Sequence, residues 1–359
     1  MPLFDFYKEK RVLVTGHTGF KGSWLCLMLH AFGAKTLGYA LEPPNVPNLF
    51  SLCELDRSMK SVTGDIRDRD RLQELFNAFS PEIVIHMAAQ PIVRASYKKP
   101  AYTYEVNVMG TVNVLECVRN TRSVRSVLNV TTDKVYKNRE WEWGYRETDP
   151  LDGYDPYSNS KSCSELVTHS YKNSFFTDGR VAVSTARAGN VIGGGDFAAD
   201  RIIPDCVRAA LSGEKMMIRN PHSVRPYQHV LEPLSAYLLI AQRQYEDAKY
   251  ADWYNVGPGE SSCVSTGELV ELFGKAWGNG FEAVIHRDVG PHEASFLRLD
   301  CSRIKSRLGW KPVWNIARAI EKTVEWTKEY ANGGDVAEIM RKQIKEYKTA
   351  THNIGVELK

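Results

Sequence analysis

The sequence predicts an α/β fold in which a doubly wound parallel sheet is followed by a smaller C-terminal α/β domain. Short apolar runs alternate with longer segments of helical spacing in the first half of the 359 residues, which is the pattern of βαβ units. The run Ile83-Val84-Ile85 is apolar throughout, as expected of a strand covered on both faces. The chain is also long enough for two domains and for a core without disulfides or metal.

The elements follow in order from a first strand at Arg11 to Thr15 and a helix at 20–33, where Gly33 is a suitable stop. Further strands are expected at 35–41, 61–63, 82–87, 124–130, 181–183, 253–256 and 283–287. Further helices are expected at 68–79, 101–119, 203–212, 233–247, 266–277 and 315–330. We therefore assign residues 1–189 to the sheet domain, 190–345 mainly to the smaller domain with a later crossing back to the sheet, and 346–359 to a fraying polar tail.

Composition excludes several classes of protein. Lys plus Arg is 46 and Asp plus Glu is 43, and a net charge of +3 is too small to indicate binding to nucleic acid or to an anionic membrane. No apolar stretch is long enough for a membrane span and the start lacks a secretory signal, so we expect a cytoplasmic protein. The 7 Cys form no CxxC pair and the 9 His no HExxH motif, so we expect reduced thiols and no metal.

A glycine-rich loop joins the first strand to the first helix. In Thr15-Gly16-His17-Thr18-Gly19-Phe20-Lys21-Gly22 the glycines are three residues apart. Glycine allows a tight turn and close approach of a pyrophosphate, and the N-terminus of the helix offers unpaired N–H groups. This context predicts a Rossmann-type dinucleotide site. The candidate cofactor-binding residues are Gly16, His17, Thr18, Gly19, Phe20 and Gly22.

The adenosine end of the cofactor is less clearly marked. Only Glu42 is acidic near the end of the second strand, and no Arg stands there to meet a 2′-phosphate, which favours NAD over NADP. Asp65 and Ile66 follow the third strand, where Asp65 is placed to bond an adenine amine. The alternative for Asp65 is a residue of a turn.

Tyr157 and Lys161 lie four residues apart, on one face of an expected helix that Asp155-Pro156 begins. A cation near a phenol favours the phenolate, which can take the proton of a hydroxyl while the carbon loses hydride. The spacing alone is weak evidence, because Tyr245 and Lys249 repeat it in a segment without other chemistry. Position after the fifth strand is what favours Tyr157.

The segment Thr131-Thr132-Asp133-Lys134 follows the fifth strand, at the sheet edge where open α/β sheets bind ligands. Thr132 can hydrogen-bond a substrate hydroxyl beside Tyr157. Asp133 is a candidate acid, and Lys134 is a candidate base if burial lowers its pKa. The alternative is a turn with two solvated charges.

Together these residues carry a family resemblance over nearly the whole chain. The glycine loop, Ala88-Ala89-Gln90, Asn107, Thr132 and the Tyr157/Lys161 pair resemble the extended short-chain dehydrogenase/reductase family. The resemblance implies NAD as cofactor, and adds Ala88, Ala89, Gln90, Asn107 and Thr131 to the residues that hold it. It also implies a homo-oligomer, a dimer or tetramer, that pairs through the helices at about 101–119 and 157–174.

The Thr132-Asp133 step resembles the nucleotide-sugar 4,6-dehydratases, in which the Asp gives a proton to the departing 6-hydroxyl. In the members that act on dTDP-glucose and GDP-mannose the next residue is Glu, the base at C5. Lys134 stands there in this chain, which resembles the members that act on CDP-glucose. The C5 base is then Lys134 or another group. The family implies a supply of deoxysugar for bacterial surface polysaccharide.

The substrate contacts are implied more weakly. Asn190 in Arg187-Ala188-Gly189-Asn190-Val191 and Arg225 resemble residues that meet the sugar diphosphate, Arg201 is similar, and His292 lies in a loop that holds the diphosphate in relatives. A surface salt bridge is the alternative for Arg201 and Arg225. Trp141 and Trp143 stand in a polar insert and form either a lid or ordinary packing.

The resemblance implies a lyase in which hydride leaves C4 and returns to C6, with no net use of NAD. Three other functions stay open: a nucleotide-sugar 4-epimerase, a net oxidoreductase on a sugar or steroid, and a non-catalytic cofactor-binding protein. The epimerase shares the glycine loop and the Tyr/Lys pair but needs no acid at O6, so Asp133 argues against it. The intact Thr132, Tyr157 and Lys161 argue against a non-catalytic protein.

Overall fold

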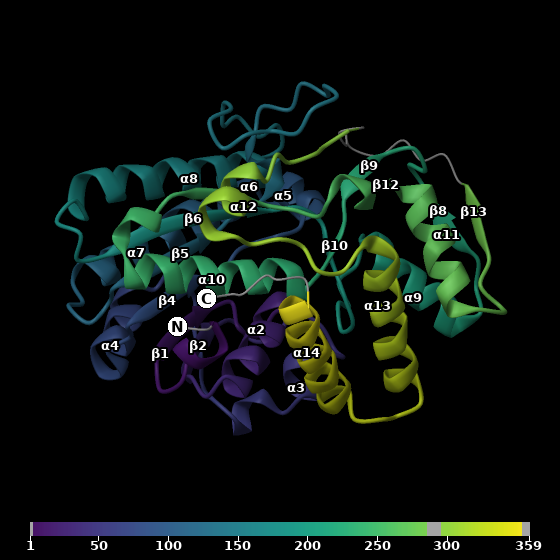
Figure 1. Cartoon of the computed structure of the whole chain (residues 1–359), viewed down its shortest axis with the longest axis horizontal. Helices are drawn as coiled ribbons and strands as arrows, with labels where there is room; N and C mark the ends of the chain where they lie inside the picture. The colour runs from purple at the N-terminus through teal and green to yellow at the C-terminus, as the bar shows by residue number, and fades with distance from the viewer. Residues whose placement is uncertain (1–2, 286–295, 354–359) are drawn as a thin grey trace.

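The computed structural model describes residues 3–285 and 296–353, and a seven-stranded sheet forms its centre (Figure 1). The strands lie in the order β11-β6-β5-β4-β1-β2-β3 and every neighbouring pair is parallel. Their bounds are β1 Arg11–Thr15, β2 Lys35–Ala40, β3 Lys60–Thr63, β4 Ile83–His86, β5 Ser126–Val130, β6 Ala182–Ala188 and β11 Trp253–Val256. The strand order reverses direction between β1 and β4, so the predicted doubly wound sheet is confirmed.

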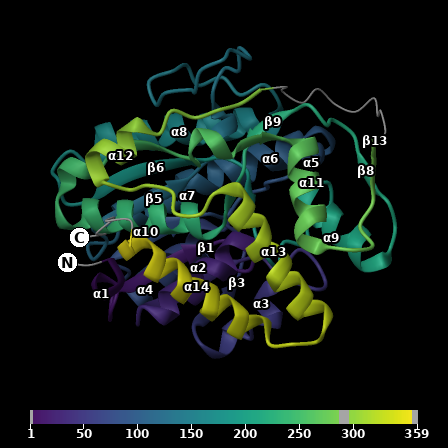
Figure 2. The ribbon, with the colours of Figure 1, turned by 45° about the vertical axis from the view of Figure 1, so that its right-hand side comes forward.

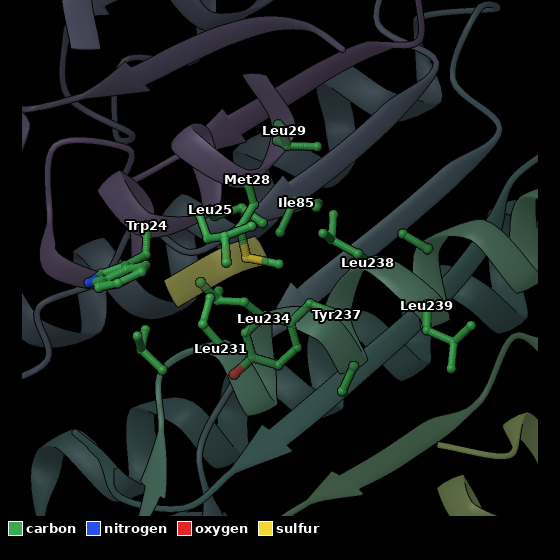
Figure 3. Packing of buried hydrophobic residues seen from close by; sticks show 14 of the residues in the cluster. Trp24, Leu25, Met28, Leu29, Ile85, Leu231, Leu234, Tyr237, Leu238 and Leu239 are labelled. Carbon is green, nitrogen blue, oxygen red and sulfur yellow. The ribbon is translucent and has the colours of Figure 1, made fainter. Parts of the chain in front are cut away.

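Alternate residues of the strands face opposite layers of helices. Val12 and Val14 belong to one core cluster with helices α2 and α10, whereas Leu13 belongs to another with α4 and α7. Figure 3 shows the first layer, where Leu25 and Met28 of α2 meet residues of α10. The helices are α1 Leu3–Phe6, α2 Phe20–Ala31 and α10 Leu231–Glu246 in the first layer, and α4 Arg69–Phe79, α7 Gly110–Arg119 and α8 Pro156–Phe175 in the second.

A smaller unit with its own core lies beside the sheet, at the right of Figure 2. Its buried residues include Ile203, Phe273 and Ile320. It contains α9 Ile202–Ser212, α11 Thr266–Trp277, α13 Ile316–Ala331 and the strand pairs β8 Met216–Ile218 with β13 Ala283–Ile285 and β9 Val224–Pro226 with β12 Cys263–Ser265. Between these segments the chain returns to the sheet, where α10 packs on one face and β11 pairs with β6. The short pair β7 Val191–Ile192 and β10 Gln228–His229 adjoins the smaller unit.

The structure differs from the sequence prediction in a long helix and in the C-terminal tail. The expected helix at 101–119 is divided into α6 Pro100–Tyr104, a π-helical turn at Glu105–Met109 and α7, and a short α5 Val93–Lys98 precedes it. The expected fraying tail is wrong as far as Asn353, because α14 Val336–Asn353 packs Met340, Ile344 and Tyr347 into the core. Residues 354–359 lie outside the described part of the chain.

The remaining short elements are α3 Leu49–Leu52, α12 Ser302–Leu308 and 3-10 turns at Leu55–Arg57, Asp133–Val135, Ala248–Tyr250 and Glu260–Ser262. Of the helices in residues 3–285 and 296–353, none has the length and apolar character needed to cross a membrane.

Candidate active site

The glycine loop lies between β1 and α2, and its three glycines serve different purposes. Gly16 has a φ of +78°, and a Cβ there would lie 2.8 Å from the Ala88 nitrogen. A Cβ on Gly22 would lie 2.2 Å from the Gly16 oxygen, so these two positions require glycine for packing. A Cβ on Gly19 would meet only the Gly16 oxygen, at 3.5 Å, and Gly19 caps α2 without a side-chain bond. Gly19 therefore leaves the start of α2 open to close approach by a phosphate.

Two loop side chains turn into the protein and fasten the loop to β3 and to the residue that follows β2. The His17 ring is buried, its Nε2 lies 2.7 Å from the Ser61 hydroxyl, and burial lowers its pKa to about 4. Gly38 makes room for this ring, because a Cβ there would lie 2.3 Å from His17 Cγ. The Thr18 hydroxyl donates to the Leu41 carbonyl at 2.9 Å. A cofactor would therefore contact the main chain of His17 and Thr18 and not their side chains.

The segment Ala88-Ala89-Gln90 follows β4 and is held from both ends. The Ala88 amide donates to the Thr15 hydroxyl at 3.1 Å, and the Gln90 amide donates to Asn107 Oδ1 at 2.8 Å. Asn107 Nδ2 donates in turn to the Gln90 carbonyl at 3.1 Å and to the Ser160 hydroxyl of α8 at 2.9 Å. Asn107 lies in the π-helical turn, a distortion that is common at functional sites. It thereby joins the loop after β4 to the helix that carries Tyr157.

The predicted adenosine contacts have partners within the chain. The Asp65 carboxylate accepts bonds from the Arg67 guanidinium at 2.8–3.1 Å and from the Arg67 amide at 2.9 Å. Hydrogen bonding by Arg67 lowers the pKa of Asp65. Glu42 accepts from the Thr63 hydroxyl at 2.8 Å. Ile66 packs against Gly110, where a Cβ would lie 2.7 Å from its Cγ2.

The carboxyl end of β5 leads into a 3-10 turn that carries Asp133 and Lys134. Thr132 caps this turn: its hydroxyl accepts from the Lys134 amide at 3.4 Å and donates to Asp133 Oδ1 at 3.0 Å. The Asp133 side chain is 1% exposed, and its Oδ2 has no hydrogen-bond partner among the described residues. Lys134 Nζ lies 3.1 Å from Asp133 Oδ1 and 3.3 Å from Asn190 Oδ1, with its side chain 31% exposed.

Helix α8 brings Tyr157 and Lys161 to the same place. Asp155 caps the helix by accepting from the Ser158 amide at 3.0 Å, with Pro156 in the first turn as predicted. The Thr132 side chain lies beside the Tyr157 phenol. Lys161 Nζ donates to the Val130 carbonyl at the end of β5, at 3.1 Å. The end of β5 thus anchors Lys161, and Thr132 just after the strand lies beside Tyr157.

Burial, rather than the neighbouring ammonium, dominates the ionisation of this pair. Burial raises the pKa of Tyr157 to about 12 against the opposing effect of Thr132. Burial lowers the pKa of Lys161 to about 7, and the nearby Lys21 ammonium lowers it further. The sequence reasoning that Lys161 lowers the pKa of the phenol is therefore wrong for the protein alone, because desolvation penalises both charged forms.

Thr131 points away from the catalytic groups. Its hydroxyl donates to Glu165 Oε1 at 2.5 Å, and Glu165 pairs with Arg187 at 2.8 Å, both side chains being 0% exposed. Thr185 also donates to this carboxylate, at 2.7 Å. The buried pair therefore ties β5, β6 and α8 together under the site.

Sequence reasoning missed Lys21 and Tyr237. Burial, followed by the charge of Arg201, lowers the pKa of Lys21 to about 8, while Asp133 acts in the opposite direction. Lys21 Nζ lies 6.0 Å from the centre of the Tyr237 ring, and the Tyr237 hydroxyl has no hydrogen-bond partner in the described part of the chain. Figure 3 shows this hydroxyl on α10, the helix that packs on α2. The available signal was a cation in the first turn of an otherwise apolar helix, where the helix dipole opposes it.

The predicted substrate contacts are only partly brought together. Asn190 meets Lys134, and Arg201 pairs with Asp196 at 2.9 Å. Arg225 lies on β9, largely buried, and donates to the Val224 carbonyl at 2.9 Å. His292 falls outside the described residues.

In the insert before α8, one tryptophan is packed against the protein and the other is exposed. The Trp141 ring packs at 5.4 Å on the Tyr145 ring, whereas Trp143 is 66% exposed. Throughout residues 3–285 and 296–353, no cluster of three or more His, Cys, Asp or Glu side chains could hold a metal ion.

Comparisons with known proteins agree with this geometry. Residues 13–323 match the family described as GDP-mannose 4,6 dehydratase. The chain is 48% identical over 353 residues to a CDP-glucose 4,6-dehydratase of Salmonella typhimurium, covering 97% of this chain and 98% of that protein. Among solved structures, a UDP-glucose 4-epimerase of Thermus thermophilus in complex with NAD is 25% identical, with a TM-score of 0.77 over 89% of this chain and 99% of that one. A dTDP-glucose 4,6-dehydratase of Bacillus anthracis in complex with NAD is 22% identical, with a TM-score of 0.76 over 91% and 99%.

Proposed function

Because the chain belongs to the GDP-mannose 4,6-dehydratase family, we propose that it is a hydro-lyase that converts CDP-D-glucose to CDP-4-dehydro-6-deoxy-D-glucose and water. The observation that carries this proposal is the buried Asp133 carboxyl, which is bonded to Thr132 beside Tyr157 and keeps one oxygen without a partner among the described residues. A 4-epimerase needs no acid there. The choice of the cytidine nucleotide rests on the 48% identity to the Salmonella enzyme and on Lys134 after Thr132-Asp133.

Tyr157 takes the proton of the 4-hydroxyl at its phenol oxygen. Its phenol lies beside Thr132, just after the end of β5, at the edge of the sheet where substrates bind. Lys161 donates to the Val130 carbonyl, and this bond keeps its amine, charged or neutral, in the same buried space as the phenol. Proton transfer by a placed group of this kind contributes about 10²–10⁴-fold to a rate.

Asp133 gives a proton to O6 as the C6–O bond breaks. Its free Oδ2 is the atom suited to face O6, because Oδ1 already receives bonds from Thr132 and Lys134. A general acid of this kind avoids the departure of free hydroxide.

The proton at C5 becomes acidic once C4 is a ketone, and we assign Lys134 as the base. Its amine is close enough to Asp133 and Asn190 to be held in one orientation. It is more exposed than Asp133, so it can reach toward a bound hexose. The base gives a proton back to C5 when hydride returns to C6.

The residues of the glycine loop fit NAD, since Gly19 leaves room where a Cβ would meet little and the start of α2 has no side-chain cap. Gly16, Gly19 and Gly22, the segment Ala88-Ala89-Gln90 and Lys161 would hold it. When bound, NAD supplies the acceptor of hydride from C4, the donor of hydride to C6 and a positive ring charge that favours the ionised phenol. The chain also offers no Arg near Glu42 to meet the 2′-phosphate of NADP.

We assign the nucleotide-sugar contacts mainly to residues 190–345, with Asn190, Arg201, Arg225 and His292 as candidates. Arginines suit a diphosphate because the guanidinium pairs with two oxygens at once. Arg201 is held by Asp196 and lies within electrostatic range of Tyr157 and Lys21, which supports its place at the sugar end.

Mass spectrometry with absorbance tests the activity. The protein with NAD is mixed with CDP-glucose and, in parallel, with the dTDP, UDP and GDP sugars. Loss of the mass of one water from CDP-glucose, with no lasting absorbance of reduced nicotinamide, is expected. An unchanged mass with inversion at C4 would establish an epimerase, and lasting absorbance would establish a net oxidoreductase. Faster dehydration of another nucleotide sugar would contradict the choice of the cytidine nucleotide.

The proposed enzyme acts in the cytoplasm as a homo-oligomer, a dimer or tetramer, that pairs through α7 and α8. Leu166 on α8 and Met109, in the π turn before α7, expose about half of their side chains, at 53% and 51%. Leu166→Glu should reduce the sedimentation coefficient to that of a monomer, with Leu211→Glu on α9 as a control of similar exposure. A monomeric wild type would contradict the assembly.

A further inference from the structure

One charged side chain of the glycine loop has no part in the proposed mechanism. Lys21 stands between Gly19 and Gly22, in the first turn of α2, and is partly buried. With the residues in 3–285 and 296–353 it makes no hydrogen bond and no ion pair. The dipole of a helix places partial positive charge at its N-terminus, so a cation is unfavourable there. The position therefore destabilises the Lys21 ammonium, and an anion beside it would offset this effect.

The charged groups around Lys21 already form pairs with one another. Asp133 and Asp196 are carboxylates within its electrostatic range, and Lys134 and Arg201 are cations within the same range. Lys134 Nζ lies 3.1 Å from Asp133 Oδ1, and Arg201 pairs with Asp196 at 2.9 Å. Each of these carboxylates thus has a cation of its own. The two pairs leave Lys21 as the cation that lacks an anionic partner among the described residues.

Tyr237 of α10 lies on the other side of the Lys21 ammonium. Lys21 Nζ is 6.0 Å from the centre of the Tyr237 ring. Tyr237 is 0% exposed, and its hydroxyl has no hydrogen-bond partner in the described part of the chain. Buried polar groups normally have such partners. Between α2 and α10, an ammonium and a hydroxyl therefore both keep hydrogen-bonding capacity that the described residues do not use.

We propose that the Lys21 ammonium binds a diphosphate oxygen of a ligand at the start of α2. Both NAD and a nucleotide sugar carry a diphosphate, and the nucleotide sugar as a source of it rests on the proposed function. Gly19 leaves the first turn of α2 open to a phosphate. Side chains of a helix lean toward its N-terminus, which brings the Lys21 ammonium to the same end. The negative charge of a diphosphate would then compensate both the ammonium and the dipole of α2.

Calorimetry tests the contact without turnover. At neutral pH, ADP-ribose is titrated into the full chain without NAD, and CDP is titrated into the NAD-loaded chain. Lys21→Met removes the charge but keeps a long side chain, and it should weaken one of these diphosphates by roughly 10- to 100-fold in Kd. Lys21→Arg should restore most of the affinity. Weaker binding of ADP-ribose would assign the contact to the cofactor, and weaker binding of CDP would assign it to the nucleotide sugar.

The matched control is Lys35→Met at the start of β2. Lys35 is an exposed lysine that pairs with Glu9 at 2.6 Å. Its loss should leave both dissociation constants unchanged. If Lys21→Met binds ADP-ribose and CDP as tightly as the wild type does, the proposal is overturned. If the wild type binds no CDP, the choice of cytidine in the proposed function is rejected, and the nucleoside diphosphate that it does bind takes the place of CDP in the comparison.

The pH dependence of binding is a second readout. Burial, followed by the charge of Arg201, lowers the pKa of Lys21 to about 8. A bound diphosphate favours the ammonium, so the affinity of the diphosphate that contacts Lys21 should fall as the pH rises above 8. This fall should be smaller in Lys21→Met, and an equal fall would contradict the contact. The other charged or titratable groups that face Lys21 are present in both chains: Asp133, Lys134, Lys161, Asp196, Arg201 and Tyr237.

Thermal unfolding separates binding from a structural role. Because the Lys21 ammonium is destabilised by its position, Lys21→Met should raise the Tm of the protein measured without nucleotide. The same variant should reduce the increase in Tm that saturating ADP-ribose or CDP produces in the wild type. A lower Tm with an undiminished increase would show that Lys21 only supports the fold, and would overturn the proposal. Absence of dehydration by the wild type would reject the proposed function and leave the ADP-ribose comparison standing.

Discussion

Two tyrosine–lysine pairs with the same spacing lie at opposite edges of one sheet. Tyr157 and Lys161 stand at the carboxyl edge, over the end of β5, beside Thr132 and Asp133. Tyr245 of α10 stands at the amino edge, where its phenol donates to Glu82 at 2.9 Å and accepts from Lys10 at 3.2 Å.

The partners of the second pair explain why it forms no site. Glu82 and Lys10, the partners of Tyr245, come directly before β4 and β1. Lys249 instead pairs with Asp247 on the surface. Helix α10 ends at Glu246, so the four-residue spacing there does not place both side chains on one helical face. A place at the carboxyl edge of the sheet therefore decides whether a tyrosine–lysine pair forms a site, and the four-residue spacing alone does not.

The largest expected contrast is between the two phenols. Tyr157→Phe should lower turnover of CDP-glucose by 10³-fold or more, on the order of what a placed acid–base group contributes, because no group takes the O4 proton. Stopped-flow absorbance should find no reduced nicotinamide in a single turnover.

Tyr245→Phe is the matched control and should keep turnover within about twofold. It loses only the bonds to Glu82 and Lys10, at a cost of about 1 kcal/mol in the free energy of unfolding. Substantial turnover in Tyr157→Phe would refute its role as base.

The second contrast is between the two carboxyls beside these phenols. Asp133→Asn should let C4 oxidation proceed but slow elimination by about 10²-fold, so the 4-keto intermediate and reduced nicotinamide accumulate. Rapid quench with mass analysis would detect the intermediate. Elimination at the wild-type rate in Asp133→Asn would place the acid elsewhere.

Glu82→Gln at the amino edge should leave both steps unchanged and alter stability alone. Hydrogen bonds from the Arg11 amide and Tyr245, followed by the charges of Lys10 and Arg11, lower the pKa of Glu82 despite the opposing effect of burial. A lowered carboxyl pKa contributes stability above its unfolded value, which is lost as the pH falls through the folded value. Urea unfolding of Glu82→Gln between pH 6 and pH 3 should therefore lose less stability than the wild type, and an equal loss would contradict this account.

The same contrast explains which parts of the molecule the sequence could predict. The strands of the parallel sheet and the helix at 266–277 follow from local signals, apolar runs and helical spacing, that tertiary contacts reinforce. The π-helical turn around Asn107 could not be predicted from spacing, because it depends on the bonds of Asn107 to Gln90 and Ser160, which are distant in sequence.

Helix α14 was missed for a different reason. Its apolar positions Val336, Met340, Ile344 and Tyr347 have helical spacing, but the polar residues after Lys342 hid it. This helix is buried by tertiary contacts. One of them is the hydrogen bond that the Tyr347 hydroxyl donates to the buried Glu232 at 2.7 Å.

In the site, the sequence identified Tyr157, Thr132 and Asp133 because they follow a recognisable strand. It did not find Lys21 or Tyr237, since their approach to Asp133 depends on how α2 and α10 pack together. The inward turn of His17 likewise depends on Gly38, a residue of the neighbouring strand. Residue type and order thus predict the catalytic side chains, whereas the charged groups around those side chains depend on tertiary packing.

The smallest expected contrast lies in the stability of the ligand-free chain as a function of pH. Burial lowers the pKa of Lys161 from 10.5 to about 7, so between these values the unfolded chain binds more protons than the folded one. Stability should therefore rise with pH from 7 toward 8.5, and Lys21, with a pKa of about 8, contributes in the same direction. Lys161→Met should reduce this rise, measured by urea unfolding at several pH values below the range where unfolded thiols ionise.

Lys249→Met provides the opposite sign at the amino edge. Hydrogen bonding to Asp247 raises the pKa of this exposed ammonium, so its contribution is complete at every pH below 10.5 and is lost only above it. The pH dependence of Lys249→Met between 7 and 8.5 should thus match that of the wild type. If Lys161→Met also matches the wild type, the Lys161 ammonium is not desolvated by the fold, and the two edges of the sheet would differ in geometry alone and not in electrostatic environment.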